Sequence, residues 1–204
     1  MAENHFDVER QKVDLNSRLI VGFERIAEVF RVLLWNHAKE LGLSPIQIQL
    51  LIFLESHAIE LCTVSHLAKE FNMTKPTISD AVKVLVQKDL ITKVAGDGDA
   101  RSYAMTLSKQ GDQVIKQVKG FTTPLEKSVN ELGKSEKEAL YQSITKLIFQ
   151  LNKDEIISVQ RTCFACRFHE KKKEGHYCHF IKEDLRDHEI RLDCGDFVLA
   201  DSRI

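Results

Sequence analysis

The stretch from Cys62 to Leu107 constrains the fold of this chain more than any other part. Two short helical patterns, at 63–71 and 74–86, are separated by a tight turn, and each begins with a threonine that can cap the helix. The period then changes from helical to alternating in LITKVA and YAMTL, which are joined by the turn GDGDARS. Two short helices and a tight turn form a helix-turn-helix, and a hairpin directly after it predicts the wing of a winged helix.

The second helix of this motif has two different faces. Its apolar residues are expected to face the core, namely Ile78, Ala81, Val82, Leu85 and Val86. The other face of its N-terminal half carries short, mostly hydrogen-bonding groups, namely Thr74, Lys75, Thr77, Ser79, Asp80 and Lys83. The sequence therefore predicts a polar, exposed surface at the start of this helix.

Long helical patterns flank the motif on both sides. Apolar residues from Leu19 to Leu33 recur at spacings of three and four in a helix expected to end near Gly42, and Ser44-Pro45 is typical of the start of the next helix. Two further apolar stripes follow Ser108, at 114–129 and 140–151. The predicted fold is mainly α with a small β-hairpin wing: a winged helix-turn-helix between long dimerisation helices, with a small Cys-rich module at the C-terminus.

The apolar stripes of the long flanking helices indicate how many chains the molecule contains. A single winged-helix unit cannot cover the stripes of both the first and the last long helix, so we expect a homodimer. The alternative is a compact monomer in which the helices fold back. The net charge of −1 gives no overall attraction to nucleic acid, and residues 60–109 carry seven Lys or Arg against six Asp or Glu, a local balance of +1. A basic face would therefore depend on how two chains are arranged.

The order of these elements and the wing sequence DARSYAMTLSKQG resemble the MarR family of bacterial transcription regulators. The resemblance covers about residues 10–152 and is most specific in the wing. Asp99, Arg101, Leu107 and Gly111 match the family's pattern of Asp, any residue, Arg, a strand ending in Leu-Thr, and Gly three residues later. From spacing alone, Asp99 and Arg101 would be a solvated turn pair.

The resemblance implies a DNA-binding surface. The helix that begins at Thr74 would enter the major groove, and the wing tip would reach the adjacent minor groove, with Arg101 near DNA and oriented by Asp99. The candidate DNA-binding residues are Thr74, Lys75, Thr77, Ser79, Asp80, Lys83, Asp99, Arg101 and Ser102. Two positions depart from the pattern: Ala100 replaces a second arginine, which removes one phosphate or minor-groove contact, and Ser108 replaces a capping threonine.

The implied partners are double-stranded DNA with an inverted repeat, a second copy of the chain, and a small-molecule effector of unidentified chemistry. The competing interpretation treats the winged helix as a platform that binds another protein, because the second wing arginine is missing and the charge is near neutral.

The last fifty residues concentrate cysteines. Cys163 and Cys166 form a C-x-x-C pair, Cys178 follows after eleven intervening residues, and Cys194 follows after fifteen more. A C-x-x-C turn directs two thiolates to one ion, and two more cysteines complete a tetrahedral site. We expect zinc, whose binding would fold a segment with too little apolar core to fold alone. The same ligands could hold an iron-sulfur cluster, and a metal-free thiol or disulfide switch is a third interpretation.

Three histidines and one further cysteine also bear on which residues would bind the metal. His169, His176 and His179 could each replace one cysteine ligand, although exposed polar roles are more common for such residues. Cys62 stands apart and is expected to be a small buried hydrophobic residue.

The domain organisation follows from these patterns: a winged-helix and dimerisation domain at 1–152 and a Cys-rich metal-binding module at 153–204. The polar, acidic N-terminus lacks the pattern of a signal peptide, and no apolar run is long enough to span a bilayer, so we expect a cytoplasmic protein without a membrane partner. The expected class is not an enzyme. A thiol-disulfide active site is the weakest alternative, because no thioredoxin-like context surrounds Cys163.

Overall fold

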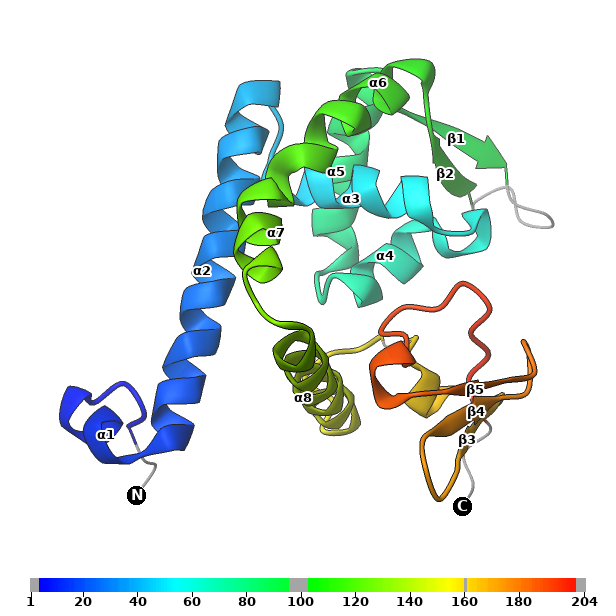
Figure 1. Ribbon diagram of the computed structural model, residues 1–204. Coiled ribbons are helices and arrows are strands. Elements are labelled where there is room, and N and C mark those ends of the chain that lie inside the picture. The colour runs from blue at the N-terminus through cyan, green and yellow to red at the C-terminus, as the bar shows by residue number, and fades with distance from the viewer. Residues whose placement is uncertain (1–3, 96–102, 160, 201–204) are drawn as a thin grey trace.

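The computed structural model describes residues 4–95, 103–159 and 161–200. Figure 1 shows a body of short helices with a two-stranded wing, a long helix along one side of it, and a small sheet-containing tail on the other side. The fold is mainly helical with a two-stranded wing, as predicted, and the tail adds a second small antiparallel sheet that was not predicted.

The N-terminal part consists of a short helix α1 (Val8–Val13) and the long helix α2 (Leu15–Leu41). Helix α2 ends at Gly42, whose φ of 62° is the left-handed conformation that glycine adopts without strain. Helix α3 (Pro45–Ser56) begins with a capping box, in which Ser44 and Gln47 bind each other's backbone amides. Both predicted helix boundaries are confirmed.

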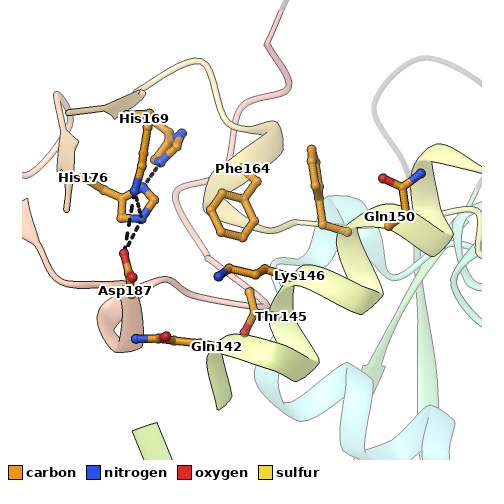
Figure 2. A pocket seen from close by; sticks show the side chains of 10 residues that line it. Gln142, Thr145, Lys146, Gln150, Phe164, His169, His176 and Asp187 are labelled. Atoms are coloured by element: carbon orange, nitrogen blue, oxygen red, sulfur yellow. Dashed lines mark hydrogen bonds and ion pairs between the residues drawn. The ribbon is translucent and has the colours of Figure 1, made fainter. Parts of the chain in front are cut away.

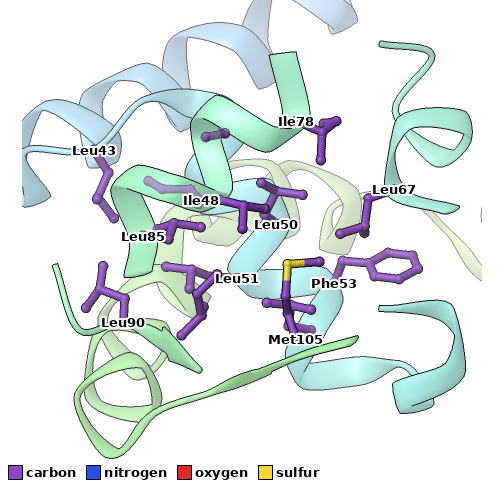
Figure 3. Close-up of a cluster of buried hydrophobic side chains, with 14 of the residues drawn as sticks. Leu43, Ile48, Leu50, Leu51, Phe53, Leu67, Ile78, Leu85, Leu90 and Met105 are labelled. Atoms are coloured by element: carbon purple, nitrogen blue, oxygen red, sulfur yellow. The ribbon is translucent and has the colours of Figure 1, made fainter. Parts of the chain in front are cut away.

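The core is built around α3, which packs against α2, the helix-turn-helix and the wing (Figure 3). The 3-10 turn η1 (Ile59–Leu61) leads into α4 (Val64–Glu70) and α5 (Lys75–Gln87), which form the helix-turn-helix. The largest fully buried side chains of this part are Ile48, Leu50, Leu51, Leu67, Ile78, Val82 and Leu85. Cys62 is also buried in this core, as expected.

One residue of α5 that was expected in the core, Val86, lies on the surface. Val86 is 37% exposed, whereas Ile78, Ala81, Val82 and Leu85 are buried. At the last turn of α5 the core lies beneath Leu85 and Leu90, and a position next to Leu85 on the helix points away from it.

The wing consists of β1 (Ile91–Ala95) and β2 (Tyr103–Leu107), paired antiparallel with Ile91 opposite Leu107. Ile91 and Met105 are buried and fasten the wing to the body. The turn between the strands, with Asp99, Ala100, Arg101 and Ser102, lies outside the described residues.

Four helical segments follow the wing: α6 (Lys109–Val118), the 3-10 turn η2 (Lys119–Thr122), α7 (Thr123–Asn130) and α8 (Lys134–Lys153). Helix α6 begins with Ser108, whose hydroxyl accepts a hydrogen bond from the amide of Gly111 at 3.0 Å. A side chain at Gly111 has no space, since a Cβ there would lie 2.0 Å from the carbonyl oxygen of Leu90. Glycine at position 111 therefore allows the start of α6 to pack closely against the backbone of Leu90, just after the helix-turn-helix.

The tail contains a 3-10 turn η3 (Cys163–Ala165), three short strands and a second 3-10 turn η4 (Asp187–Glu189). The strands β3 (His169–Lys171), β4 (His176–Cys178) and β5 (Glu183–Leu185) form one antiparallel sheet in that order. The tail packs on α8, where the Tyr141 hydroxyl donates to the carbonyl oxygen of the buried Ile190 at 2.6 Å. Helix α8 ends at Lys153, next to the predicted domain boundary, and the boundary itself stays a prediction.

Arg161 connects the tail to the helix-turn-helix. Its guanidinium lies 2.7 Å from a carboxylate oxygen of Glu70 on α4 and 2.7 Å from one of Asp193 in the tail. The hydrogen bonds to these two carboxylates raise the pKa of Arg161 further above its ordinary high value, although burial opposes this. The side chain is only 10% exposed, so this ion pair is better shielded from water than an ordinary surface pair.

A second connection runs from the linker after α8 to the turn between α4 and α5. Asn72 adopts a left-handed conformation with φ of 49°, and its side-chain amide nitrogen donates to the carbonyl oxygen of Ile156 at 3.2 Å. Its side-chain oxygen also lies within hydrogen-bonding distance of Ser158. The tail thus contacts both the first helix and the turn of the helix-turn-helix.

Replacing Gly111 with alanine is expected to lower the free energy of unfolding by about 3 kcal/mol, because the added Cβ overlaps the backbone of Leu90 and forces α6 to move. Urea denaturation at a fixed protein concentration measures this effect. Gly120→Ala is the matched control, because its Cβ would meet nothing closer than 3.9 Å. Equal midpoints for the two variants would contradict the tight approach of α6 to Leu90.

Candidate functional site

The N-terminal half of α5 presents the polar face that the sequence predicts. Ile78, Ala81 and Val82 hold one side of this helix in the core. The opposite side is exposed at every predicted position, namely Thr74, Lys75, Thr77, Ser79, Asp80 and Lys83. Hydroxyl, ammonium and carboxylate groups on one exposed helix face are the kinds of group that contact phosphates and base edges in a groove.

The start of α5 is held by a local hydrogen-bond arrangement. The Thr74 hydroxyl caps the helix by accepting from the amide of Thr77 at 3.3 Å, and the two threonine hydroxyl oxygens lie 2.8 Å apart. Pro76 occupies the first turn, where its missing N–H leaves no intrahelical bond unmade. The N-terminus of α5 is therefore a well-defined, exposed end whose dipole favours an anion.

The candidate DNA-binding residues of the wing are Asp99, Arg101 and Ser102, and all three lie outside the described residues. At the base of the wing, the ammonium group of Lys93 lies 4.1 Å from the centre of the Tyr103 ring. Lys93 is an exposed cation of β1 that the sequence analysis did not single out.

Exposed apolar residues lie along α2, and further ones lie on α7 and α8. The exposed apolar residues of α2 are Leu15, Leu19, Ile20, Phe23, Ile26, Val29, Phe30, Val32 and Trp35. Those of α7 and α8 are Val129, Leu140, Leu147 and Leu151. Exposed apolar side chains on successive turns of one long helix mark a site of contact with another molecule.

The four cysteines of the tail line a single small cavity of about 30 Å³, together with Phe168 and Phe180. The sequence analysis predicted that Cys163, Cys166, Cys178 and Cys194 converge, and they do line one site. Within the described ranges, however, no group of three or more His, Cys, Asp or Glu side chains already stands in a metal-binding arrangement. The thiols surround the space without closing on a common centre.

The surroundings of these thiols suit thiolate ligands. The backbone amide of Arg191 donates to the sulfur of Cys163 at 3.3 Å, and the Arg191 guanidinium donates to the sulfur of Cys194 at 3.7 Å. Burial raises the pKa of the Cys163 thiol and the other three cysteines add to this, although the hydrogen bond from the Arg191 amide opposes it. A bound divalent cation would reverse this, because it stabilises thiolates that otherwise repel each other. The donor set and its N–H···S bonds therefore fit a metal ion.

The nearby histidines have other partners. His169 and His176 lie with their ring nitrogens 2.8 Å apart, and His176 reaches Asp187 at 2.9 Å. His179 is paired with Glu170 at 2.7 Å on an exposed part of the sheet. These contacts support a ligand set made of the four cysteines.

Two features of this region were not predicted from the sequence. Arg161 and Glu70 are separated by 91 positions, and no local pattern pairs them. Phe164, labelled in Figure 2, lies against Phe149 of α8, with ring centres 5.3 Å apart, and no sequence pattern indicated this contact. In the parts of the chain that the structure describes, no helix is long and apolar enough to cross a membrane.

Comparison with known proteins finds a family that one part of this chain resembles. Residues 41–102 match the sequence model of the MarR family. No curated protein sequence matches the chain significantly.

Several solved structures share the fold. The Staphylococcus aureus MepR–DNA complex is 22% identical with a TM-score of 0.56, and the match covers 63% of this chain and 95% of that one. S. aureus MarR in complex with salicylate and kanamycin is 18% identical with a TM-score of 0.58, covering 73% and 99%. Streptococcus pneumoniae FabT in complex with DNA is 19% identical with a TM-score of 0.53, covering 68% and 99%.

These structures are matched over nearly their whole length, while more than a quarter of this chain lies outside each match. The family match spans the end of α2, helices α3 to α5 and the wing up to residue 102, the elements that carry the recognition motif. The body of this chain is therefore a winged-helix fold that is similar to the MarR family over residues 41–102.

Proposed function

We propose that this protein is a transcription regulator that binds double-stranded DNA as a homodimer, at an operator with an inverted repeat. The exposed polar face at the start of α5 carries the proposal, because it places hydroxyl groups together with Lys75 and Lys83 on the outer side of a helix whose other side is buried in the core. The DNA complexes of MepR and FabT, which share this fold, support the same assignment.

In this proposal α5 lies in the major groove. Thr74, Thr77 and Ser79 would donate to phosphates or base edges, and Lys75 and Lys83 would neutralise phosphates. Arg101 at the wing tip would reach the adjacent minor groove, with Asp99 orienting it. The wing has one arginine where relatives of this kind commonly carry two, so we expect a larger share of the binding free energy to come from α5.

The homodimer would form through the apolar surface of α2, α7 and α8. Leu19, Phe23 and Ile26 lie on successive turns of one face of α2, and each is between 46% and 50% exposed. Burying such residues against a second chain is favourable by about 25 cal/mol per Å² of apolar surface. The same contact would place two α5 helices on one side of the dimer, which matches the symmetry of an inverted repeat.

We further propose that Cys163, Cys166, Cys178 and Cys194 hold one zinc ion. When bound, zinc supplies a crosslink and a positive charge that keeps the four thiols ionised. Four cysteines, two of whose sulfurs accept N–H bonds, suit a zinc ion, and the alternatives are an iron-sulfur cluster and a metal-free thiol switch. Because Arg161 and Asp193 link this module to α4, the metal would also support the position of the helix-turn-helix.

A second candidate function is a winged helix that binds a protein partner. The near-neutral charge of the chain and Ala100 in the wing favour it. This alternative predicts no dependence of binding on the phosphates of DNA.

Lys75→Ala and Lys83→Ala are expected to weaken binding to a mixed-sequence DNA duplex, because each removes a phosphate contact. For each variant, the slope of log K against log salt should become shallower by about one. Fluorescence anisotropy over a range of salt concentrations measures both effects. Lys137→Ala on α8 is the control. If both α5 variants bind with the affinity and salt slope of the control, α5 does not contact DNA.

Phe30→Glu is expected to give a monomer, because it places a charge in the apolar surface of α2 where the ring is already 42% exposed in one chain. Sedimentation at micromolar concentration should show the wild type at twice the 23.4 kDa mass of one chain and the variant at that single mass. Arg25→Glu, an equally drastic change at a side chain that is 75% exposed, should stay dimeric. A monomeric wild type would refute the proposed homodimer.

Cys194→Ser is expected to lose the bound zinc and to expose the tail to protease, while residues up to about 152 stay folded, because the tail has little apolar core of its own. Elemental analysis and limited proteolysis of the same sample measure both results. Cys62→Ala, which changes a cysteine buried in the winged-helix core, should keep its zinc. A wild-type tail that resists protease equally with and without a chelator would count against a structural metal.

A further inference from the structure

A groove of about 570 Å³ lies between the helix-turn-helix and the linker at 154–159 that follows α8. Helix α4, the turn after it and the start of α5 line one part of the groove, and Ile156 and Ser158 of the linker line the rest. In Figure 1 this linker leaves α8 and passes below α4. The linker lies beyond residues 41–102, the part of the chain that resembles the MarR family. The groove is therefore built in part by a segment outside the winged helix.

The charged side chains that line this groove are cationic. Lys69 of α4 and Lys75 of α5 are exposed, and neither makes an ion pair with any residue that the structure describes. Ser65 adds a hydroxyl group. Glu70, which follows Lys69 in the chain, is bound to Arg161 at 2.7 Å, and no carboxylate among the described residues lines the groove. Two positive charges without a negative one favour an anion.

Asn72 joins the two sides of the groove. Its side-chain nitrogen donates to the carbonyl oxygen of Ile156 at 3.2 Å, and its side-chain oxygen accepts from the hydroxyl of Ser158. An amide nitrogen carries two hydrogens, so one N–H of Asn72 is left for another acceptor. The linker thus fixes the orientation of an exposed donor beside the two lysines.

The position of the groove indicates which anion it would meet. Lys75 lies in the first turn of α5, the helix proposed to enter the major groove of DNA. Ser65 and Lys69 lie on α4, and the first helix of a helix-turn-helix crosses the DNA backbone. A groove that lies between these two helices and faces solvent is therefore next to the backbone of the bound half-site.

We propose that this groove binds a phosphate of the DNA backbone, and that the linker after α8 completes the site through Asn72. The phosphate oxygens would pair with Lys69 and accept from the remaining N–H of Asn72. The tail segment would then form part of the DNA interface. This inference rests on the proposed function, since it requires α5 to lie in the major groove.

Fluorescence anisotropy of the full chain, with its metal and a mixed-sequence DNA duplex, tests the site. Lys69→Ala is expected to weaken binding about tenfold and to make the slope of log K against log salt shallower by about one, because it removes a phosphate contact. Asn72→Gly should weaken binding about fivefold with an unchanged slope, because it removes a neutral donor. Glycine keeps the left-handed backbone at this position, where φ is 49°. Lys137→Ala, on α8 and outside the groove, should bind as the wild type does.

Ser158→Ala tests the contribution of the linker. It removes the hydroxyl that holds Asn72 but removes no charge, so it should weaken DNA binding about threefold with an unchanged salt slope. In the Asn72→Gly background the same change should have no further effect, because the two side chains act as one unit. Equal effects of Ser158→Ala in both backgrounds would overturn the role of the linker in the site.

Lys83→Ala separates this inference from the proposed function, because Lys83 lies on α5 outside the groove. If Lys83→Ala makes the salt slope shallower and Lys69→Ala leaves it unchanged, the groove does not bind DNA and the proposed function stands. If neither variant changes the slope, both proposals fail. Binding of inorganic phosphate that Lys69→Ala abolishes, with DNA affinity intact, would assign the groove to a free anion and overturn the inference.

Discussion

The arrangement of this protein depends on the burial of helix α3. Ile48 and Leu51 are completely buried and Leu50 is 1% exposed, because α2, α5, α6 and the wing all pack around this one helix. Once α3 occupies the centre, the apolar side of α5 must face it and the polar side of α5 must face out. The same packing uses only part of α2, so its remaining apolar residues stay on the surface. Both the candidate DNA surface and the candidate dimer surface therefore follow from where α3 is buried.

The sequence predicted the winged helix well, because its signals are local. Ser44, Thr63, Thr74 and Ser108 all cap the helices that they were expected to cap. The alternation in the wing likewise gave the observed strand pairing. The prediction failed where an amphipathic face ends: Val86 was expected to face the core, but it is 37% exposed at the end of α5. The tight approach of Gly111 to Leu90 also required coordinates, since nothing in the spacing shows which backbone a glycine meets.

The tail was predictable in its chemistry and less so in its contacts. Cysteine spacing alone indicated that four thiols gather, and they line one cavity. The ion pair between Arg161 and Glu70 joins residues far apart in the chain, and charged residues are too common for a sequence to show which two meet. Phe164 lies against Phe149 of α8, and both rings line a cavity between α8 and the tail (Figure 2). The sequence indicated the thiol cavity of the tail but not this one.

The central claim is that two copies of this chain read an inverted repeat through α5. Selection of DNA sequences from a random pool by the full-length protein tests it most directly. The account predicts enrichment of an inverted repeat whose half-site centres lie about one helical turn, or about ten base pairs, apart. A pool that remains random after repeated selection would contradict the account and favour a winged helix that binds a protein partner.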